Sequence, residues 1–365
     1  EGGDIQEGAC MLARGALSAF TGVAGVQQYG TAFSSIARSA SSRYISMKSA
    51  GEGGGIPADE RFLFDLNGFL VLRGILSPEE VAAANAAVDA KQSLMQARDT
   101  AALRNTKAGS PLDASGPRLD MGGMLFWEQP HCEVFRTMLC HPKLVPYLTE
   151  LCGLGYRLDH QPLLIAQERD SEGFSLHGGP VTQDGRFNPT LQYRCEQGQL
   201  WTSLLAVSFQ LCDHDPGDGG FCVVRGSHKL QLPCPADLAS GASAAFREHV
   251  YQPATKAGDV VLWSEATIHG ATPWRGAHQR RLALYRFAPA NMGYGRGYLE
   301  YPQAQLQQMT PMQRAVLEPP YADRLDRPLV TPRQALEERE GEPPTLSRNE
   351  EKRKLDEVLF GTKYF

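Results

Sequence analysis

Residues 257–270 read AGDVVLWSEATIHG, and this stretch decides the fold class. Gly258 and Asp259 are turn formers, and the apolar run at residues 260–263 has the length and the β-branched content of a buried strand. His269 follows shortly after this run, so a polar side chain stands where a buried strand has just ended. The stretch predicts a short strand, bounded by turns, with a candidate functional histidine beyond its end.

Similar apolar runs lie elsewhere in the chain. Residues 280–287 predict a final strand, residues 220–224 another, and residues 163–166 a short one. Residues 201–212 alternate in a way that predicts a strand with one set of side chains on the same side, namely Ser203, Leu205, Val207, Phe209 and Leu211. Short strands separated by Gly, Pro and Asp turns predict a mainly β protein, a β-sandwich or jelly roll with helices packed outside.

The residues before these strands have helical character. Residues 62–72 predict a short helix followed by a strand, and the sequence Ser-Pro-Glu-Glu at residues 77–80 predicts a helix start with a capping box. Residues 132–153 predict a further helical stretch with apolar faces. Residues 95–122 contain Gly and Pro and predict a loop.

Composition excludes several classes of protein. The chain has 365 residues, of which 42% are hydrophobic and 21% charged, so it is not mainly disordered. The net charge is -5 and no Lys/Arg-rich stripe occurs, so we expect no nucleic-acid binding, which requires many phosphate contacts. No apolar run reaches the ~18 residues of a membrane span. The eight cysteines form no Cys-x-x-Cys pair, and we expect buried free thiols in a reducing compartment.

The two ends of the chain differ in composition from its middle. Residues 8–51 contain no acidic residue, which is typical of an organelle transit peptide or of a disordered leader. We expect a leader at residues 1–57, a jelly-roll domain with N-terminal helices at residues 58–332, and a charged tail at residues 333–365. A transit peptide would place the protein in the mitochondrion or plastid; otherwise we expect it in the cytoplasm. Because the sequence begins with Glu, we expect a fragment or a processed product.

Two of the nine histidines stand out by their context. His177 lies in the sequence FSLHGGP just after a strand-like run, and His269 follows the strand at residues 260–263. Arg280 opens the final strand. Two histidines on different strands can share a metal ion inside a jelly roll, and an arginine on a neighbouring strand can clamp a carboxylate with two parallel hydrogen bonds.

The motifs around these residues resemble the phytanoyl-CoA dioxygenase family of iron(II)/2-oxoglutarate oxygenases, over roughly residues 62–290. The similar segments are NGFLVLRG (67–74), LSPEE (76–80), DPGDGGF (215–221), RGSHK (225–229), AGDVVL (257–262), His269-Gly270 and Arg280. The resemblance implies a double-stranded β-helix (jelly roll, cupin-like). It also implies an enzyme that uses iron(II), 2-oxoglutarate and O2 to hydroxylate an unactivated C–H bond of a small organic or acyl substrate.

The resemblance assigns roles to individual residues. His177 is the first metal ligand, His269 is the distal ligand, and Arg280 binds the carboxylate of 2-oxoglutarate. Arg281 takes that last role if the register is shifted by one residue. Neighbouring residues of a strand point to opposite faces, so only one of the two arginines can serve.

The sequence departs from the family at Gly179, where the usual His-x-Asp motif has its metal-binding carboxylate. One interpretation is a halogenase, in which chloride or bromide occupies the vacated position at the iron. A second is a non-catalytic jelly-roll binding protein. The third is an oxygenase in which water or a carboxylate from elsewhere fills the position, the candidates being Asp184 and also Glu168, Asp170, Glu172 and Asp213.

Overall fold

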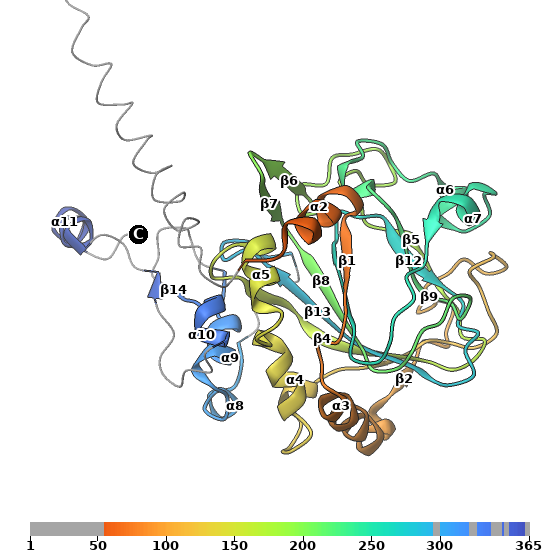
Figure 1. The fold of residues 1–365 in the computed structure, drawn as a ribbon, viewed down its shortest axis with the longest axis horizontal. Helices are drawn as coiled ribbons and strands as arrows, with labels where there is room; N and C mark the ends of the chain where they lie inside the picture. The colour runs from red at the N-terminus through yellow and green to blue at the C-terminus, as the bar shows by residue number, and fades with distance from the viewer. Residues whose placement is uncertain (1–54, 295–299, 321–326, 337–344, 347–349, 362–365) are drawn as a thin grey trace, which may run out of the picture. The chain divides into compact units, whose positions relative to one another are not determined.

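The computed structural model describes residues 55–294, 300–320, 327–336, 345–346 and 350–361. Two antiparallel sheets form its centre, and helices α4 (Glu133–Thr137) and α5 (Val145–Cys152) lie on the side of the larger sheet that faces away from the smaller one (Figure 1). The predicted mainly β architecture with flanking helices is therefore confirmed.

The larger sheet has seven strands in the order β1-β11-β8-β13-β4-β3-β2, and all of its neighbouring pairs are antiparallel. Neighbours in this sheet are mostly distant in sequence, as expected for a jelly roll, in which the chain passes repeatedly between two sheets. The strands are β1 (Phe69–Leu72), β2 (Gln96–Ala97), β3 (Leu119–Met121), β4 (Arg157–Gln167), β8 (Leu205–Gln210), β11 (Val260–Ser264) and β13 (Arg280–Ala288).

The smaller sheet has four strands in the order β10-β9-β12-β5. Val223 of this sheet belongs to the same buried cluster as Trp263 and Leu282 of the larger sheet, so the inner faces of the two sheets pack together. The strands are β5 (Phe174–His177), β9 (Gly220–Val224), β10 (Val250–Tyr251) and β12 (His269–Thr272). Two separate two-stranded sheets are the hairpin of β6 (Tyr193–Glu196) with β7 (Gln199–Thr202) and the pair of β14 (Arg327–Pro328) with β15 (Thr345–Leu346).

Both faces of the larger sheet are buried, and side chains alternate between two cores. In β13, Leu282 and Leu284 belong to the core between the sheets, whereas Ala283 and Tyr285 belong to the core beneath the helices. This alternation follows from the two-residue period of a strand. It explains why every residue of β8 is buried, and it decides which side chains of β13 reach the interior between the sheets.

The helices follow the predicted signals at the N-terminal end. In the capping box of α3 (Pro78–Ala90), the Glu80 backbone N–H donates to Ser77 Oγ over 3.2 Å and the Ser77 backbone N–H donates to Glu80 Oε2 over 2.8 Å, as predicted. The other α-helices of the described residues are α2 (Ala58–Asn67), α6 (Ala236–Ala239), α7 (Ala245–His249), α8 (Gln303–Leu306), α9 (Pro311–Val316), α10 (Pro332–Leu336) and α11 (Glu350–Phe360).

Three local predictions need correction. The helical stretch at 132–153 is interrupted at His141, which leaves the helical region (φ −57°, ψ 127°) because Pro142 follows it. The prediction of one strand over 201–212 is wrong: β7 belongs to a hairpin with β6, and the chain leaves that hairpin before it enters the larger sheet as β8. The loop predicted at 95–122 contains the two short strands β2 and β3.

Some predictions concern residues outside the described ranges. Residues 1–54, which make up nearly all of the expected leader, are among them, so the transit peptide and the location that it would specify stay predictions. The seven cysteines within the described residues are all free thiols, and five of them are buried. No helix in the described part of the chain is long and apolar enough to cross a membrane.

Candidate active site

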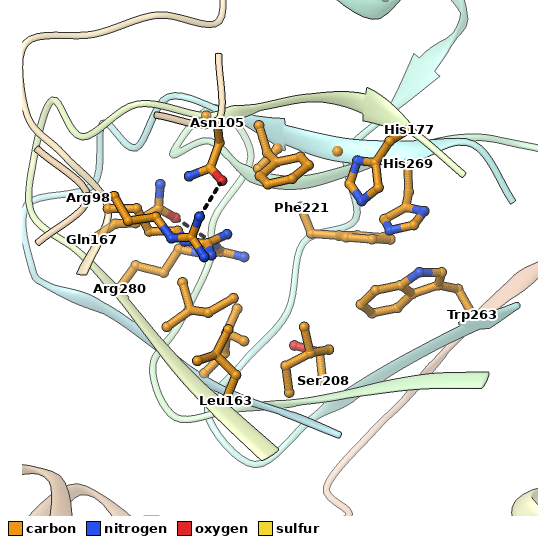
Figure 2. A pocket seen from close by; sticks show the side chains of 18 of the residues that line it. Arg98, Asn105, Leu163, Gln167, His177, Ser208, Phe221, Trp263, His269 and Arg280 are labelled. Atoms are coloured by element: carbon orange, nitrogen blue, oxygen red, sulfur yellow. Dashed lines mark hydrogen bonds between the residues drawn. The ribbon is translucent and has the colours of Figure 1, made fainter. Parts of the chain in front are cut away.

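His177 and His269 are brought together by strand pairing. His177 is the last residue of β5, His269 is the first residue of β12, and the two residues are direct partners in the register of the smaller sheet. Their ring centroids are 4.3 Å apart. Residues that lie 92 positions apart in sequence (269 − 177) therefore present their imidazoles side by side, as the sequence predicted (Figure 2).

The hydrogen bonds of the two rings leave the same atom of each available. Nδ1 of His177 lies 2.9 Å from the Ser175 carbonyl oxygen, and Nδ1 of His269 lies 2.8 Å from the Thr267 carbonyl oxygen. A carbonyl oxygen only accepts, so each Nδ1 carries the proton and each Nε2 carries a lone pair. Burial is the main cause that lowers the pKa of His177 to about 3 and also lowers the pKa of His269. Both rings are neutral at physiological pH, which is the form that ligates metals.

Arg280 lies at the opposite end of the same cavity (Figure 2). It is 4% exposed and donates from Nη1 to the Gln167 side-chain oxygen, while its Nε has no hydrogen-bond partner among the described residues. Burial lowers its pKa to about 10, so it remains charged at neutral pH. The described residues place no carboxylate against this cation, and a buried unpaired charge of this kind suits an anionic ligand.

Gly220 makes room for the Arg280 side chain. A Cβ atom built at Gly220 would lie 2.8 Å from Nε and 3.1 Å from Cζ of Arg280. The backbone of Gly220 also has φ +86°, a conformation that glycine adopts without steric cost. Gly220, the first residue of β9, therefore leaves the space that the guanidinium occupies.

Arg281, the alternative in a shifted register, points away from the cavity. It lies on the helix side of β13, where Nη2 is 2.7 Å from Asp89 Oδ1 and Nη1 donates to Asn85 of α3. The alternation that places Leu282 in the inner core places Arg280 there as well. The shifted register is therefore not supported.

The cavity between the histidines and Arg280 has a volume of about 310 Å³. Most of its wall is apolar and comes from the inner faces of both sheets, and Phe221 and Trp263 flank the His269 ring. Two further cations, Arg98 and Arg118, line it and share the Asp120 carboxylate. The apolar lining residues are Leu163, Ile165, Phe174, Phe221, Trp263, Ala271, Leu282 and Leu284.

None of the carboxylates considered as substitutes from sequence lines this cavity. Asp184 is exposed and accepts a hydrogen bond from Arg186 Nε over 2.7 Å. Glu172 is fully buried but pairs with Arg104 over 3.0 Å, away from the histidines. The other three bind polar or basic side chains elsewhere: Glu168 binds Gln279, Asp170 binds Arg275, and Asp213 binds Lys256.

The carboxylate that does lie beside the histidines is Glu265, which sequence reasoning missed. Its Oε2 is 3.5 Å from Nε2 of His269, and its Oε1 accepts from Arg286 Nε over 2.7 Å. Burial alone would raise the pKa of Glu265, but the charge of Arg286 and its hydrogen bond to the carboxylate act in the opposite direction, and the pKa of Glu265 lies below its usual range. A signal was present, since Glu265 is the one acid in the otherwise uncharged stretch of residues 260–270, and acids are rarely buried without a partner.

The geometry fits a metal ion and a dicarboxylate ligand. Metal-ligating histidines donate their second ring N–H to a carbonyl or carboxylate, as His177 and His269 do here. Arg280 presents a buried cation at the other end of the cavity, suited to the far carboxylate of a ligand that chelates the ion. Among the described residues, no three His, Cys, Asp or Glu side chains are already gathered around one point, so the third protein position is not preformed.

Comparison with known proteins supports the fold and the family. The family model described as phytanoyl-CoA dioxygenase (PhyH) matches residues 64–282. A structure of HygX from Streptomyces hygroscopicus with nickel, 2-oxoglutarate and hygromycin B bound has a TM-score of 0.52 and 20% identity, and the match covers 66% of this chain and 91% of that chain. The structure of HygX with iron bound has a TM-score of 0.50 and 21% identity, and the match covers 67% of this chain and 90% of that chain.

A third solved structure, EctD from S. alaskensis with bound Fe, has a TM-score of 0.46 and 22% identity, and the match covers 66% of this chain and 79% of that chain. A search among curated proteins gave no match. At these identities the likeness to HygX shows the fold, which is the predicted double-stranded β-helix.

Proposed function

The chain belongs to the phytanoyl-CoA dioxygenase family of non-haem iron, 2-oxoglutarate-dependent enzymes, and from this premise we propose that it hydroxylates an unactivated C–H bond of a small organic or acyl substrate. One observation carries the proposal: a single cavity has two neutral histidines with free Nε2 atoms at one end and an unpaired buried arginine at the other. Neither a simple binding pocket nor a structural core requires this combination.

The residues of the chain divide the work of binding. His177 and His269 would hold iron(II) through their Nε2 atoms, and Arg280 would hold the far carboxylate of 2-oxoglutarate. Bound iron(II), with 2-oxoglutarate and O2, supplies oxidation in which 2-oxoglutarate is converted to succinate and CO2 and one oxygen atom enters the substrate C–H bond. Gln167 fixes the Arg280 guanidinium by accepting from Nη1, so the cation is oriented before the ligand arrives.

The apolar wall serves the same chemistry. Trp263 lies 5.2 Å and Phe221 lies 6.1 Å from the His269 ring, measured between ring centroids, and both cover the metal end of the cavity. Such side chains exclude water, which strengthens the electrostatic interactions of the site and suppresses side reactions. An apolar wall also favours a substrate whose reacting part is hydrocarbon.

A halogenase is the alternative, and the observation that favours it is Gly179. Loss of the usual carboxylate removes one negative charge at the ion, and chloride or bromide can restore it. One feature weighs against this alternative: Glu265 already brings a negative charge to His269, with Oε2 3.5 Å from Nε2. Added halide distinguishes the two reactions, because only a halogenase requires it.

Three variants test the proposal by succinate production with iron(II), 2-oxoglutarate and O2. We expect His269→Ala to abolish turnover because it removes one of two imidazole donors. We expect Arg280→Ala to raise the 2-oxoglutarate concentration for half-maximal turnover at least tenfold, since a charge-assisted bidentate contact contributes roughly 1.5–3 kcal/mol. Arg281→Ala is the matched control, because this neighbouring arginine faces α3, and it should leave that concentration unchanged. Unchanged turnover in His269→Ala contradicts the proposal.

A further inference from the structure

The segment after the first histidine packs directly against the turn before the second. A Cβ atom at Gly178 would lie 2.7 Å from the Thr267 carbonyl oxygen and 2.8 Å from the Glu265 carbonyl oxygen. The backbone N–H of Gly179 also points to the Glu265 carbonyl oxygen over 3.4 Å. The two consecutive glycines, both with positive φ, therefore allow residues 265–269 to approach His177 closely.

A side chain at position 179 would crowd the turn before the second histidine. The Cβ atom that replaces a hydrogen of Gly179 would first meet Cγ1 of Ile268, at 3.3 Å. Ile268 packs in a separate apolar cluster with Leu176 and Cys222. An aspartate at position 179 would crowd Ile268 and would have to adopt φ +97°, which residues with a side chain rarely take. The glycine is therefore more than the loss of a carboxylate at an otherwise unchanged site.

Glu265 presents a carboxylate on the histidine side of the same turn. Its side chain is 7% exposed, and Oε2 lies 3.5 Å from His269 Nε2, the atom left free when Nδ1 donates to Thr267. Two donors that each lie about 2.1 Å from one ion are roughly 3.0 Å apart at a right angle and farther apart at wider angles. The observed separation is therefore one that two ligands of a single ion can keep.

Arg286 orients this carboxylate without using all of it. Its Nε donates to Oε1 of Glu265 over 2.7 Å, which leaves Oε2 directed at His269. Arg286 lies on the inner face of β13, six residues after Arg280, and also lines the cavity. A ligating carboxylate that is itself hydrogen-bonded by a neighbour is the usual arrangement around protein-bound metals.

We propose that Glu265 is the third protein ligand of the metal centre, replacing the carboxylate that Gly179 lacks. The inference rests on the proposed function, since it assumes an iron site at His177 and His269. It restores the two-histidine, one-carboxylate donor set and its charge from a different position in the chain. Because the three side chains are not already gathered around one point in the described residues, the bound ion draws Glu265 toward the histidines.

Binding of Co(II) to the purified full chain, followed by calorimetry, tests the inference without requiring activity. We expect Glu265→Gln and Glu265→Asp to weaken Co(II) binding about tenfold or more, because loss of a ligand costs at least as much as loss of an outer-shell partner. Glu265→Asp retains the charge that Arg286 needs, so it serves if Glu265→Gln does not fold. Asp184→Asn is the control, and this exposed carboxylate should be replaceable without effect.

A second readout separates a ligand from a residue that merely pairs with Arg286. In Glu265→Ala, added formate should restore part of the Co(II) affinity, and added chloride should change the visible Co(II) spectrum. The wild-type protein should respond to neither, because its own carboxylate occupies the position.

The outcomes distinguish the two proposals. Co(II) affinity equal to wild type in both Glu265→Gln and Glu265→Asp, together with loss of binding in His269→Ala, overturns the assignment of Glu265 and leaves the proposed function standing. Co(II) binding that is absent in wild type, or that persists in His269→Ala, overturns both.

Discussion

At the scale of single residues, Gly220 shows how a position without a side chain can determine ligand binding. Its Cα lies so close to the Arg280 guanidinium that any Cβ atom would displace it. We expect Gly220→Ala to raise the 2-oxoglutarate concentration for half-maximal turnover severalfold while Co(II) affinity, measured at the other end of the cavity, stays unchanged. The physical reason is that the added methyl group would displace the Arg280 guanidinium from the position in which it binds the carboxylate.

Gly217→Ala is the matched control for this substitution. Gly217 has a similar backbone (φ +94°) in the turn just before β9, but no atom lies within 4 Å of its added Cβ. Both alanines incur the backbone cost of about 1 kcal/mol for a left-handed conformation, and only Gly220→Ala touches Arg280. Equal effects of the two variants on the 2-oxoglutarate requirement would contradict a role of Gly220 in placing the guanidinium.

Three of the site residues could be predicted from sequence and one could not, for a physical reason. His177, His269 and Arg280 could be named from sequence because each lies beside a strand with recognisable neighbours, and strand alternation separates Arg280 from Arg281. Glu265 could not be named, because its place beside His269 depends on the close approach of the turn to Gly178. That approach is a tertiary contact with no local pattern of its own.

At the scale of elements, the start or end of a helix can be predicted well when the residues that cause it lie within a few positions of one another in sequence. The capping box of α3 is such a case, and Ser77→Ala should lower the free energy of unfolding by about 1 kcal/mol, because one backbone N–H at the helix start loses its acceptor. Urea denaturation measures the change. Ala83→Ser, an exposed substitution in the middle of α3, should have a smaller effect, and equal stability of Ser77→Ala and wild type would show that the cap contributes nothing.

Boundaries that depend on the choice of partner strand were predicted poorly. The alternating residues 201–212 read as one strand, yet β7 pairs with β6 and β8 pairs with β11 and β13, so two different partners divide the run. Periodicity reports which face a residue takes, and it does not report which strand lies beside it.

At the scale of the whole molecule, the site depends on a division between the two faces of the larger sheet. Its outer face packs against helices such as α4, where the Tyr285 hydroxyl donates to the Phe135 carbonyl oxygen over 2.7 Å. Its inner face packs in part against the smaller sheet and in part lines the cavity. The core under the helices stabilises the sheet, so part of the inner face is free to line a cavity. Apolar runs in the sequence predict the strands and hence the fold class, whereas the shape of the cavity depends on how the two sheets pack, which no single run shows.

The most direct test of a metal centre that chelates 2-oxoglutarate at one end of this cavity is an anaerobic titration of the wild-type protein with iron(II) and 2-oxoglutarate. The visible charge-transfer band of the chelate is recorded with and without chloride or bromide. We predict that the band forms, that it requires His269, and that halide does not shift it, since Glu265 supplies the third protein ligand. Absence of the band under these conditions would contradict the central claim, and a band that shifts with halide would instead favour the halogenase.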